Sequence, residues 1–493
     1  MRICLTVALL SLLLLAGGCA SEEPGISPDR DRFYFPTGMA LDPQRPLLYV
    51  ACSNADLAFN GGTLVTLDLT RLPADLRRVG ELVTQKKLDC EPARTDITGW
   101  ECDEAQFIDP DATLRMGDFP STVRVASDGS RLFVPVRGQN YLLWADILDR
   151  DAGQRRVDLR CDTEACANSA SSENCTAWDC DVEHRVDYSE ELRQSLPEEP
   201  FGIVVNELVA VHVGPDGARR TCRDGLAQAP SCDCPAASEC QGEHDVGCCH
   251  SAPAAGRTHV YLTHLYGGEV SFFTSGPEGV VLRDIRGGFF TPSSSGVRGA
   301  FALAPRRPGD PDSRIYVSSR VDSVLASFIV RDNSRIVDEG RVSMGALYPG
   351  NDSRDLVFSP GGDRLYVVSQ QPASLVAFDM SLEYGHPKGE PLWIAEVCAE
   401  PSLTRLDPAL SRAYVVCFGT AQIFVVDTSL GTVIDQIETG NGPNELVLDP
   451  SNHRAFVANF LENSVGVIDM DPSHSTYHRM VVRIGLQKDL VKH

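Results

Sequence analysis

The chain has 493 residues, of which 43% are hydrophobic, 23% charged and 7% aromatic. This composition is that of a folded globular protein and excludes disordered, collagen-like and multispanning membrane proteins. Acidic residues outnumber basic ones by 68 to 44, giving a formal charge of −24, and this excludes nucleic acid as an expected partner because phosphate binding needs a basic surface. Seventeen cysteines are typical of an oxidising compartment.

The N-terminal segment has the features of an export signal. Arg2 supplies a positive charge, and the apolar run at residues 3–15 is too short to span a membrane. The run continues into Leu-Ala-Gly-Gly directly before Cys19, which resembles the signal of bacterial lipoproteins, whose cysteine is lipidated and becomes the N-terminus. An ordinary secretory signal with an incidental cysteine is the alternative.

The lipoprotein interpretation divides the chain at Cys19. Residues 1–18 are then a signal peptide, and residues 19–32, rich in Glu, Pro, Gly and Asp, are a flexible tether. Ala20 and Ser21 stand where an aspartate would resemble an inner-membrane retention signal. We therefore expect a lipid-anchored cell-envelope protein, in the outer membrane and facing the periplasm or the surface, with residues 488–493 as a C-terminal tail.

Residues 33–487 contain an internal repeat. Each unit has a proline, two variable residues, an alternating apolar run, a turn, and a second strand centred on an aromatic residue. The aromatic residue stands at seven places: Tyr49, Phe133, Tyr261, Tyr316, Tyr366, Tyr414 and Phe456. The last three intervals, of 50, 48 and 42 residues, are close to one four-stranded propeller blade. The sequence predicts an all-β, seven-bladed β-propeller of four-stranded antiparallel blades; a β-sandwich with coincidental spacing is the alternative.

The repeat also predicts the innermost strand of each blade. We expect these strands at residues 37–41, 121–126, 202–206, 300–304, 355–359, 402–406 and 444–449. Third strands tend to end in aspartate, whose carboxylate can accept hydrogen bonds from the next turn. The ring should close by pairing of residues 32–35 with the seventh blade, because an open ring leaves a strand edge exposed.

The second strands resemble those of a known family. Tyr-Val-Ala-Cys at 49–52, Tyr-Val-Val-Ser at 366–369 and Phe-Val-Ala-Asn at 456–459 are similar to the YVTN-type repeats of the lactonase-like β-propellers, which are mostly extracytoplasmic. The resemblance implies a seven-bladed fold over residues 33–485 apart from insertions. It implies no single activity, because the family includes lactone hydrolases, redox-enzyme propellers and non-catalytic binding proteins.

Three insertions interrupt the repeat and hold most of the cysteines. Residues 71–111 lie between the third and fourth strands of the first blade, residues 161–199 between the second and third blades, and residues 214–257 within the first hairpin of the third blade. We expect disulfides because small polar insertions cannot fold by burial alone. The candidates are Cys90 with Cys102; Cys161, Cys166, Cys175 and Cys180 among themselves; Cys222, Cys232, Cys234, Cys240, Cys248 and Cys249 among themselves; and Cys398 with Cys417.

One cysteine is left over by this pairing. Without Cys4 and Cys19, the number of cysteines is odd. Cys52 ends the second strand of the first blade and has no cysteine near it in the sequence, so we expect it to be the thiol that stays single or pairs between chains. The four-cysteine and six-cysteine groups should lie on opposite faces of the propeller, because one insertion joins two blades and the other interrupts a first-to-second hairpin.

Motifs of known catalytic chemistry are absent from the sequence. It has no Gly-x-Ser-x-Gly elbow, Walker loop, His-Glu-x-x-His, dinucleotide fingerprint or Cys-x-x-Cys-His haem motif, so we expect no cofactor. Arg354, Asp355, Asn444 and Glu445 fall near the predicted channel mouth. Such residues either perform acid–base chemistry or solvate the opening, and we prefer solvation.

Two segments contain residue types that bind metals. Residues 243–250 hold two cysteines, two histidines and a glutamate, which are zinc ligands, but clustered cysteines in an oxidising compartment favour disulfides. Residues 54–60 hold Asn and Asp side chains before a glycine, loosely like a calcium loop, but they lack the closing glutamate. We expect a turn held by Asn and Asp there, and no metal site.

Two classes of function fit these features. The first is a non-catalytic binding or interaction scaffold, held at the membrane by its lipid, whose partner is a protein, a glycan or a small molecule. The second is a lactonase-like hydrolase with its active site at the channel mouth. We prefer the first, because no reactive group is identifiable; convergent titratable groups with perturbed pKa values in a pocket at the mouth would favour the enzyme.

Overall fold

The computed structural model describes residues 25–93, 99–150, 156–162, 178–208, 211–213, 219–221, 249–250, 258–310, 313–344 and 351–485. The expected signal peptide, Cys19 and the C-terminal tail lie outside these residues, as do Cys166 and Cys175. The side chains of the six-cysteine group and of the zinc-ligand candidates at 243–250 also lie outside them. Among the described residues, no helix combines the length and apolarity needed to cross a membrane.

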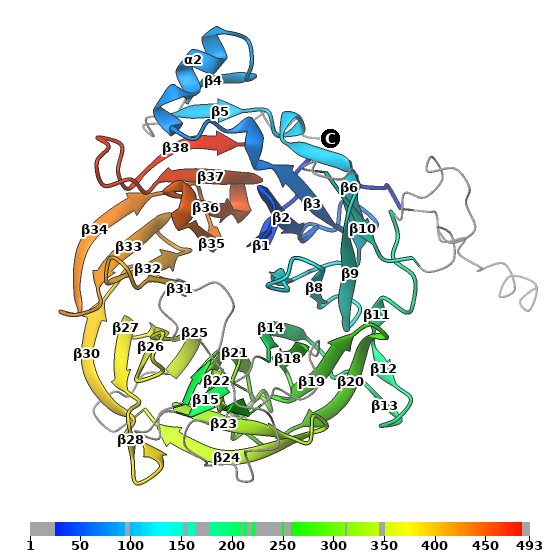
Figure 1. Ribbon diagram of the computed structural model, residues 1–493, viewed down its shortest axis with the longest axis vertical. Coiled ribbons are helices and arrows are strands. Elements are labelled where there is room, and N and C mark those ends of the chain that lie inside the picture. The colour runs from blue at the N-terminus through cyan, green and yellow to red at the C-terminus, as the bar shows by residue number, and fades with distance from the viewer. Residues whose placement is uncertain are drawn as a thin grey trace, which may run out of the picture.

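Seven antiparallel sheets stand around a central channel, so the chain is the all-β, seven-bladed β-propeller that the sequence predicts (Figure 1). Each blade has four main strands, which follow one another along the chain from the channel outward. These strands, blade by blade, are β1 (Pro36–Leu41), β2 (Leu47–Cys52), β3 (Gly62–Asp68) and β6 (Ile108–Met116); β7 (Arg124–Val125), β8 (Arg131–Val136), β9 (Tyr141–Asp149) and β10 (Val157–Arg160); β14 (Pro200–Glu207), β18 (Thr258–His264), β19 (Val270–Gly276) and β20 (Gly279–Arg286); β21 (Ala300–Pro305), β22 (Ile315–Ser319), β23 (Val324–Arg331) and β24 (Arg335–Ser343); β25 (Asn351–Phe358), β26 (Arg364–Gln371), β27 (Ala373–Asp379) and β30 (Glu390–Glu396); β31 (Pro401–Asp407), β32 (Arg412–Cys417), β33 (Gln422–Asp427) and β34 (Thr432–Glu438); β35 (Pro443–Asp449), β36 (Arg454–Asn459), β37 (Ser464–Asp469) and β38 (Arg479–Ile484).

The connections between these strands contain short elements of their own. Between β3 and β6 lie η1 (Leu69–Arg71), η2 (Leu76–Arg78), α2 (Val79–Thr84), β4 (Cys90–Pro92), β5 (Trp100–Cys102) and η3 (Glu104–Gln106). The remaining ones are β11 (Arg185–Val186), β12 (Tyr188–Ser189) and β13 (Gln194–Ser195) before the third blade; β15 (Val211–Val213), β16 (Arg219–Thr221) and β17 (Cys249–His250) between β14 and β18; β28 (Leu382–Glu383) and β29 (His386–Pro387) in the fifth blade; and η5 (Pro450–Asn452) and η6 (Phe460–Glu462) in the seventh.

The inner strands lie where the repeat predicts them, within a few residues. The second blade deviates most, because β7 has only two residues instead of the expected 121–126. Its first part is replaced by an isolated bridge between Pro120 and Val136.

The aromatic residues of the second strands pack between neighbouring blades. All seven are buried. The ring centroid of Tyr261 lies 5.5 Å from that of Phe328 in the next blade, and the centroid of Tyr316 lies 5.2 Å from that of Phe358. Burying such a side chain stabilises a fold by about 1.5–3 kcal/mol. The repeated aromatic residue therefore joins each blade to its neighbour, which explains its period.

Aspartates at the ends of third strands fix the following turn, as predicted. Asp427 Oδ1 accepts hydrogen bonds from the backbone N–H groups of Ser429 at 2.8 Å and Leu430 at 3.0 Å. Its other oxygen lies 3.1 Å from a guanidinium nitrogen of Arg412, the residue directly opposite in the ladder. Such a side-chain acceptor stabilises the turn, which ends at Gly431 with a positive φ of 68°.

Three disulfides lie within the described residues. They join Cys90 to Cys102, Cys161 to Cys180, and Cys398 to Cys417. The first and third are the expected pairs, and the second lies inside the four-cysteine group. Cys52 is a free and buried thiol, and burial raises its pKa to about 12. This thiol is therefore a packing residue of the core rather than a reactive group.

The ring closes differently from the prediction. The seventh blade takes all four of its strands from the C-terminal segment, and β5 of the first insertion pairs in parallel with its outer strand β38. Residues 32–35 form no strand there; the N–H of Phe35 donates to Asn463 Oδ1 at 2.7 Å, and Arg32 pairs with Asp103 at 2.8 Å. The exposed edge of β38 is thus covered by an insertion rather than by the N-terminal segment.

Removal of a buried ion pair at this junction tests the closure. Glu101 and Arg483 are 3% and 4% exposed, and their charged atoms lie 2.8 Å apart. We expect Glu101→Ala to lower the free energy of unfolding by about 3 kcal/mol, because a buried guanidinium loses its main partner. The double variant Glu101→Leu/Arg483→Met removes both charges and should recover most of this loss in urea unfolding. Exposed ion pairs contribute up to about 1 kcal/mol. A loss of unfolding free energy below that value in Glu101→Ala would contradict this closure.

Candidate functional site

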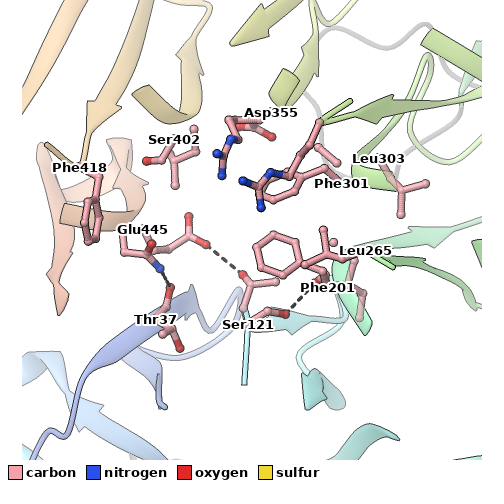
Figure 2. Close-up of a pocket in the computed structure, with 18 of the residues that line it drawn as sticks. Thr37, Ser121, Phe201, Leu265, Phe301, Leu303, Asp355, Ser402, Phe418 and Glu445 are labelled. Carbon is pink, nitrogen blue, oxygen red and sulfur yellow. Dashed lines mark hydrogen bonds between the residues drawn. The ribbon is translucent and has the colours of Figure 1, made fainter. Parts of the chain in front are cut away.

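A cavity of about 510 Å³ opens at one end of the central channel, and Figure 2 shows the side chains that surround it. We call it the upper cavity. Two sets of repeat positions form its wall. The first set begins the inner strands and is Thr37, Ser121, Phe201, Phe301, Arg354, Ser402 and Asn444. The second set stands at the ends of the second strands and is Arg137, Leu265, Arg320, Gln370 and Phe418.

A β-bulge near the start of the inner strand accounts for the first set in every blade except the second, where Ser121 precedes the short strand β7. Pro36 faces Cys52 in the ladder, but Gly38 faces Ala51, so Thr37 is an extra residue. The same shift by one residue occurs near the start of β14, β21, β25, β31 and β35. A bulge bends its strand and redirects the side chain of the extra residue. Here that side chain reaches the channel.

Arginine and phenylalanine side chains form the upper part of the wall. The ring centroids of Phe201 and Phe301 are 4.4 Å apart. The guanidinium carbon of Arg137 lies 5.5 Å from the centroid of Phe201, and those of Arg320 and Arg354 lie 5.6 and 5.3 Å from that of Phe301. Guanidinium groups within about 6 Å of a ring are attracted by its π-electrons. We call these five residues the upper layer.

Two carboxylates hold the arginines of the upper layer from behind. Arg137 Nε lies 3.1 Å from Glu199 Oε2, and Arg320 Nε lies 3.2 Å from Asp352 Oδ1. Arg354 Nη2 donates to the other oxygen of Asp352 at 2.9 Å. Burial lowers the pKa of Arg354, and Asp352 opposes that shift. The carboxylates thus fix one edge of each guanidinium group.

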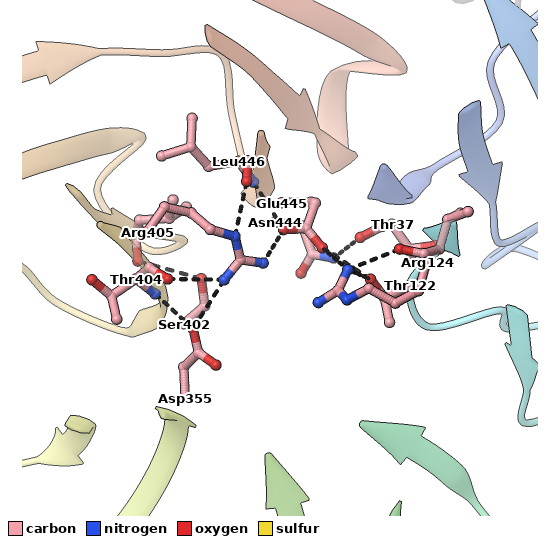
Figure 3. A network of polar contacts seen from close by, with 12 residues as sticks. Thr37, Thr122, Arg124, Asp355, Ser402, Thr404, Arg405, Asn444, Glu445 and Leu446 are labelled. Carbon is pink, nitrogen blue, oxygen red and sulfur yellow. Dashed lines mark hydrogen bonds and ion pairs between the residues drawn. The ribbon is translucent and has the colours of Figure 1, made fainter. Parts of the chain in front are cut away.

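Arg405 joins two carboxylates deeper in the channel, as Figure 3 shows. Its Nη1 lies 3.2 Å from Asp355 Oδ2, its Nη2 pairs with Glu445, and its Nε donates to the carbonyl oxygen of Leu446 at 3.1 Å. The backbone N–H of Thr404 donates to the same Asp355 oxygen at 2.8 Å. Burial raises the pKa of Asp355, and Arg405 opposes that shift. Burial alone would lower the pKa of Arg405, but the two carboxylates raise it.

Arg124 approaches Glu445 from the second blade. Thr122 Oγ1 donates to Glu445 Oε2 at 3.0 Å, and Arg124 Nη1 lies 3.7 Å from that oxygen. Arg124 also donates to Thr122 Oγ1 at 2.9 Å. Burial lowers the pKa of Arg124, and Glu445 opposes the shift. Two arginines and two carboxylates thus form a charge-balanced group, which we call the ion-pair layer: Arg124, Asp355, Arg405 and Glu445.

The ion-pair layer separates the upper cavity from a second one. The second cavity, also of about 510 Å³, lies where the inner strands end, and most of its wall is apolar, as at Phe358 and Leu448. Arg124, Arg405 and Glu445 line both cavities. The upper cavity combines three phenylalanine rings with five arginines, so it is the candidate functional site.

All four residues expected at the channel mouth line the upper cavity. Arg354 belongs to the upper layer, and Asp355 and Glu445 belong to the ion-pair layer. Asn444 has a different role, because its Nδ2 donates to the carbonyl oxygen of Thr37 at 2.6 Å and so ties the seventh blade to the first. The three charged residues, Arg354, Asp355 and Glu445, are held in ion pairs.

Other residues of the wall were not identified from the sequence. Phe201 and Phe301 occupy the first of the two variable positions that begin each repeat. That variability in an otherwise regular unit is the signal that could have located them. Arg124 and Arg405 lie further along the inner strands, where a single sequence gives no sign that they meet the same glutamate.

The segment at residues 54–60 is a turn held by Asn and Asp, as predicted. Asn54 Oδ1 accepts from the N–H of Phe59 at 3.1 Å, and its Nδ2 donates to Asp118 at 2.7 Å. Asp56 accepts from the N–H of Ala58 at 3.2 Å. Within the part of the chain that the structure describes, no group of three or more His, Cys, Asp or Glu side chains is placed to hold a metal ion.

No protein-family model matches the chain, and no curated protein matches it. Similar solved structures include hydrazine synthase of Kuenenia stuttgartiensis, at 10% identity and a TM-score of 0.48, covering 92% of this chain and 100% of that one. A protein from Lactobacillus plantarum has 12% identity and a TM-score of 0.45, covering 83% and 86%. A putative 6-phosphogluconolactonase from Bacteroides uniformis has 12% identity and a TM-score of 0.45, covering 81% and 84%. The structural neighbours thus include lactonase-like propellers, but likeness at this level carries no argument about function.

Removal of Arg405 tests the ion-pair layer. We expect Arg405→Gln to lower the free energy of unfolding near neutral pH by about 3–5 kcal/mol, because buried carboxylates lose their shared cation. Burial already raises the pKa of Asp355, and without Arg405 it rises further. The folded variant then binds a proton more tightly than the unfolded chain, so the deficit should shrink as the pH falls from about 7 to about 5.

Urea unfolding at the two pH values measures this change. Arg335→Gln, which alters an exposed arginine of β24 in the fourth blade, is the matched control and should unfold like the wild type. A deficit of the same size at both pH values would contradict the assigned role of Arg405.

Proposed function

We propose that this protein is a lipid-anchored binding protein of the cell envelope, whose propeller takes up a small molecule in the upper cavity without transforming it. The observation that carries the proposal is the cavity itself, about 510 Å³ and walled by phenylalanine rings and arginines. Small-molecule sites are typically concave, of roughly 300–1,000 Å³, with apolar walls and a few fixed polar groups.

The hydrogen bonds of the ion-pair layer support binding rather than catalysis. Asp355 accepts from two backbone N–H groups at 2.8 and 3.0 Å and pairs with Arg405. Glu445 accepts from the Thr122 hydroxyl and from a backbone N–H, and it also pairs with Arg405. A general base needs an oxygen within reach of the substrate proton. The oxygens of these two residues serve instead to hold the network.

A lactonase-like hydrolase is the second candidate, and Glu400 is the residue that favours it. Glu400 is an exposed carboxylate that lines the upper cavity. A carboxylate in that place can activate water, and neighbouring arginines can stabilise the negative charge that develops on a lactone carbonyl. Binding remains the preferred function, because a general base must hold its oxygen toward the substrate proton, and the exposed carboxylate of Glu400 faces solvent.

The proposed location rests on the sequence and the cysteines. The segment before Cys19 resembles a lipoprotein signal, and Ala20 and Ser21 favour the outer membrane. Three disulfides within the described residues fit an oxidising compartment. Residues 19–32 would tether the propeller to its lipid, leaving the upper cavity accessible to ligands in the periplasm or outside the cell.

Replacement of the anchoring cysteine tests this location. We expect Cys19→Ser to shift the protein from the membrane fraction to the soluble fraction of a bacterial host, because the acyl chains supply the membrane affinity. Immunoblots of fractionated cells measure the shift. Cys52→Ser, which changes a buried thiol of the propeller, should leave the protein with the membranes. Membrane retention of Cys19→Ser would contradict the lipoprotein proposal.

Assays of lactone hydrolysis and ligand binding distinguish the two candidate functions. In a pH-stat, the purified protein should release no acid from γ-butyrolactone or glucono-δ-lactone above the buffer rate. In thermal-shift screens of small metabolites, ligands that stabilise the wild type should lose their effect in Arg354→Gln and keep it in Arg335→Gln. Lactone turnover that disappears in Glu400→Gln would instead establish the hydrolase.

A further inference from the structure

We infer that the upper cavity binds a monocarboxylate with a flat apolar body, such as an aromatic acid. This inference rests on the proposed function, because it names the ligand class of the same site. Two independent features carry it: the uncommitted donors of the upper layer and the aromatic rings on opposite walls.

The arginines of the upper layer present N–H donors that the protein does not use. Arg137 donates to Glu199 through Nε and Nη2, and Arg320 donates to Asp352 through Nε. Arg354 donates through Nη2 to Asp352 and to Gln370 Oε1, the latter at 2.7 Å. Among the described residues, Nη1 of these three arginines makes no hydrogen bond. Guanidinium groups bind carboxylates through charge-assisted hydrogen bonds, often two in parallel. One edge of each guanidinium group is thus fixed, and the other can receive an anion.

Arginines and carboxylates are equal in number around the upper layer. Its three arginines face Glu199 and Asp352, and Glu400 lines the same cavity and acts electrostatically on Arg354. A monocarboxylate brings a single negative charge to these groups, whereas a phosphate monoester brings about −1.5 to −2 near neutral pH. The carboxylates of the wall therefore favour the ligand with the smaller charge.

Aromatic rings on two sides of the cavity can hold the body of the ligand. Phe201 and Phe301 lie on one wall, and Phe418 lies on the opposite wall (Figure 2). Leu265 and Leu303 extend the apolar surface beside the first two rings. Flat apolar molecules pack well on ring faces. A ligand with an aromatic body and one carboxylate would use both the rings and the arginines.

Isothermal titration calorimetry with naphthalene-2-carboxylate and naphthalene-2-carboxamide tests this ligand class, since the two probes share a shape and differ in charge. We expect the carboxylate to bind at least about tenfold more tightly than the amide. Its affinity should fall about tenfold in Arg354→Gln and severalfold in Phe301→Leu, and it should stay unchanged in Arg335→Gln. Arg320→Gln replaces a side chain that is 40% exposed and serves as the arginine variant where Arg354→Gln does not fold.

The outcomes separate this inference from the proposed function. Equal affinity for the acid and the amide, no binding of either, or tighter binding of inorganic phosphate would overturn the ligand class. Binding of gluconate or an uncharged sugar that requires Arg354, with no affinity for the naphthalene carboxylate, would also overturn it and leave the proposed function standing. Lactone turnover that requires Glu400 would overturn the proposed function itself.

Discussion

The candidate site depends on one constraint of the backbone, the extra residue near the start of the inner strands. The shift by one residue is present in six inner strands, from β1 to β35. Because the extra residue is not part of the regular pairing, its side chain can point to the channel while its neighbours pack between blades. The aromatic residues that pack between blades and the residues that surround the opening are therefore separate sets. This separation allows one propeller fold to carry many different sites.

The ion-pair layer explains how the channel is closed below the upper cavity. Arg405 is held by Glu445 from the seventh blade and Asp355 from the fifth, so three inner strands meet through one guanidinium group. A buried ion pair adds little net stability compared with apolar packing. Its benefit here is geometric, since it places a polar floor between a cavity with arginines and rings and a mainly apolar one. Ligand recognition is then left to the upper layer.

The fold could be predicted because the residues that specify it recur at the spacing of the blades. The site could be predicted only at positions that follow the same spacing. The buried aromatic residue of each second strand recurs at blade spacing, and Arg354, Asp355, Asn444 and Glu445 lie at or next to the predicted start of an inner strand. The predicted closure of the ring was wrong because the strand that covers the seventh blade, β5, has only three residues and pairs with a strand almost 400 positions away. Such a pairing leaves no periodic signal in the sequence. Arg124 and Arg405 were missed for the same reason, since only the closed ring brings them to Glu445.

The most direct test of a binding site built by these bulges is a crystal structure with 6-bromonaphthalene-2-carboxylate, because anomalous scattering locates the bromine atom. We predict one bromine peak between Phe418 and the Phe201–Phe301 wall, with the carboxylate of the ligand at Arg320 and Arg354. A peak only in the apolar cavity beyond the ion-pair layer, beside Phe358 and Leu448, would contradict this account, as would a ligand-saturated crystal with no peak in the channel.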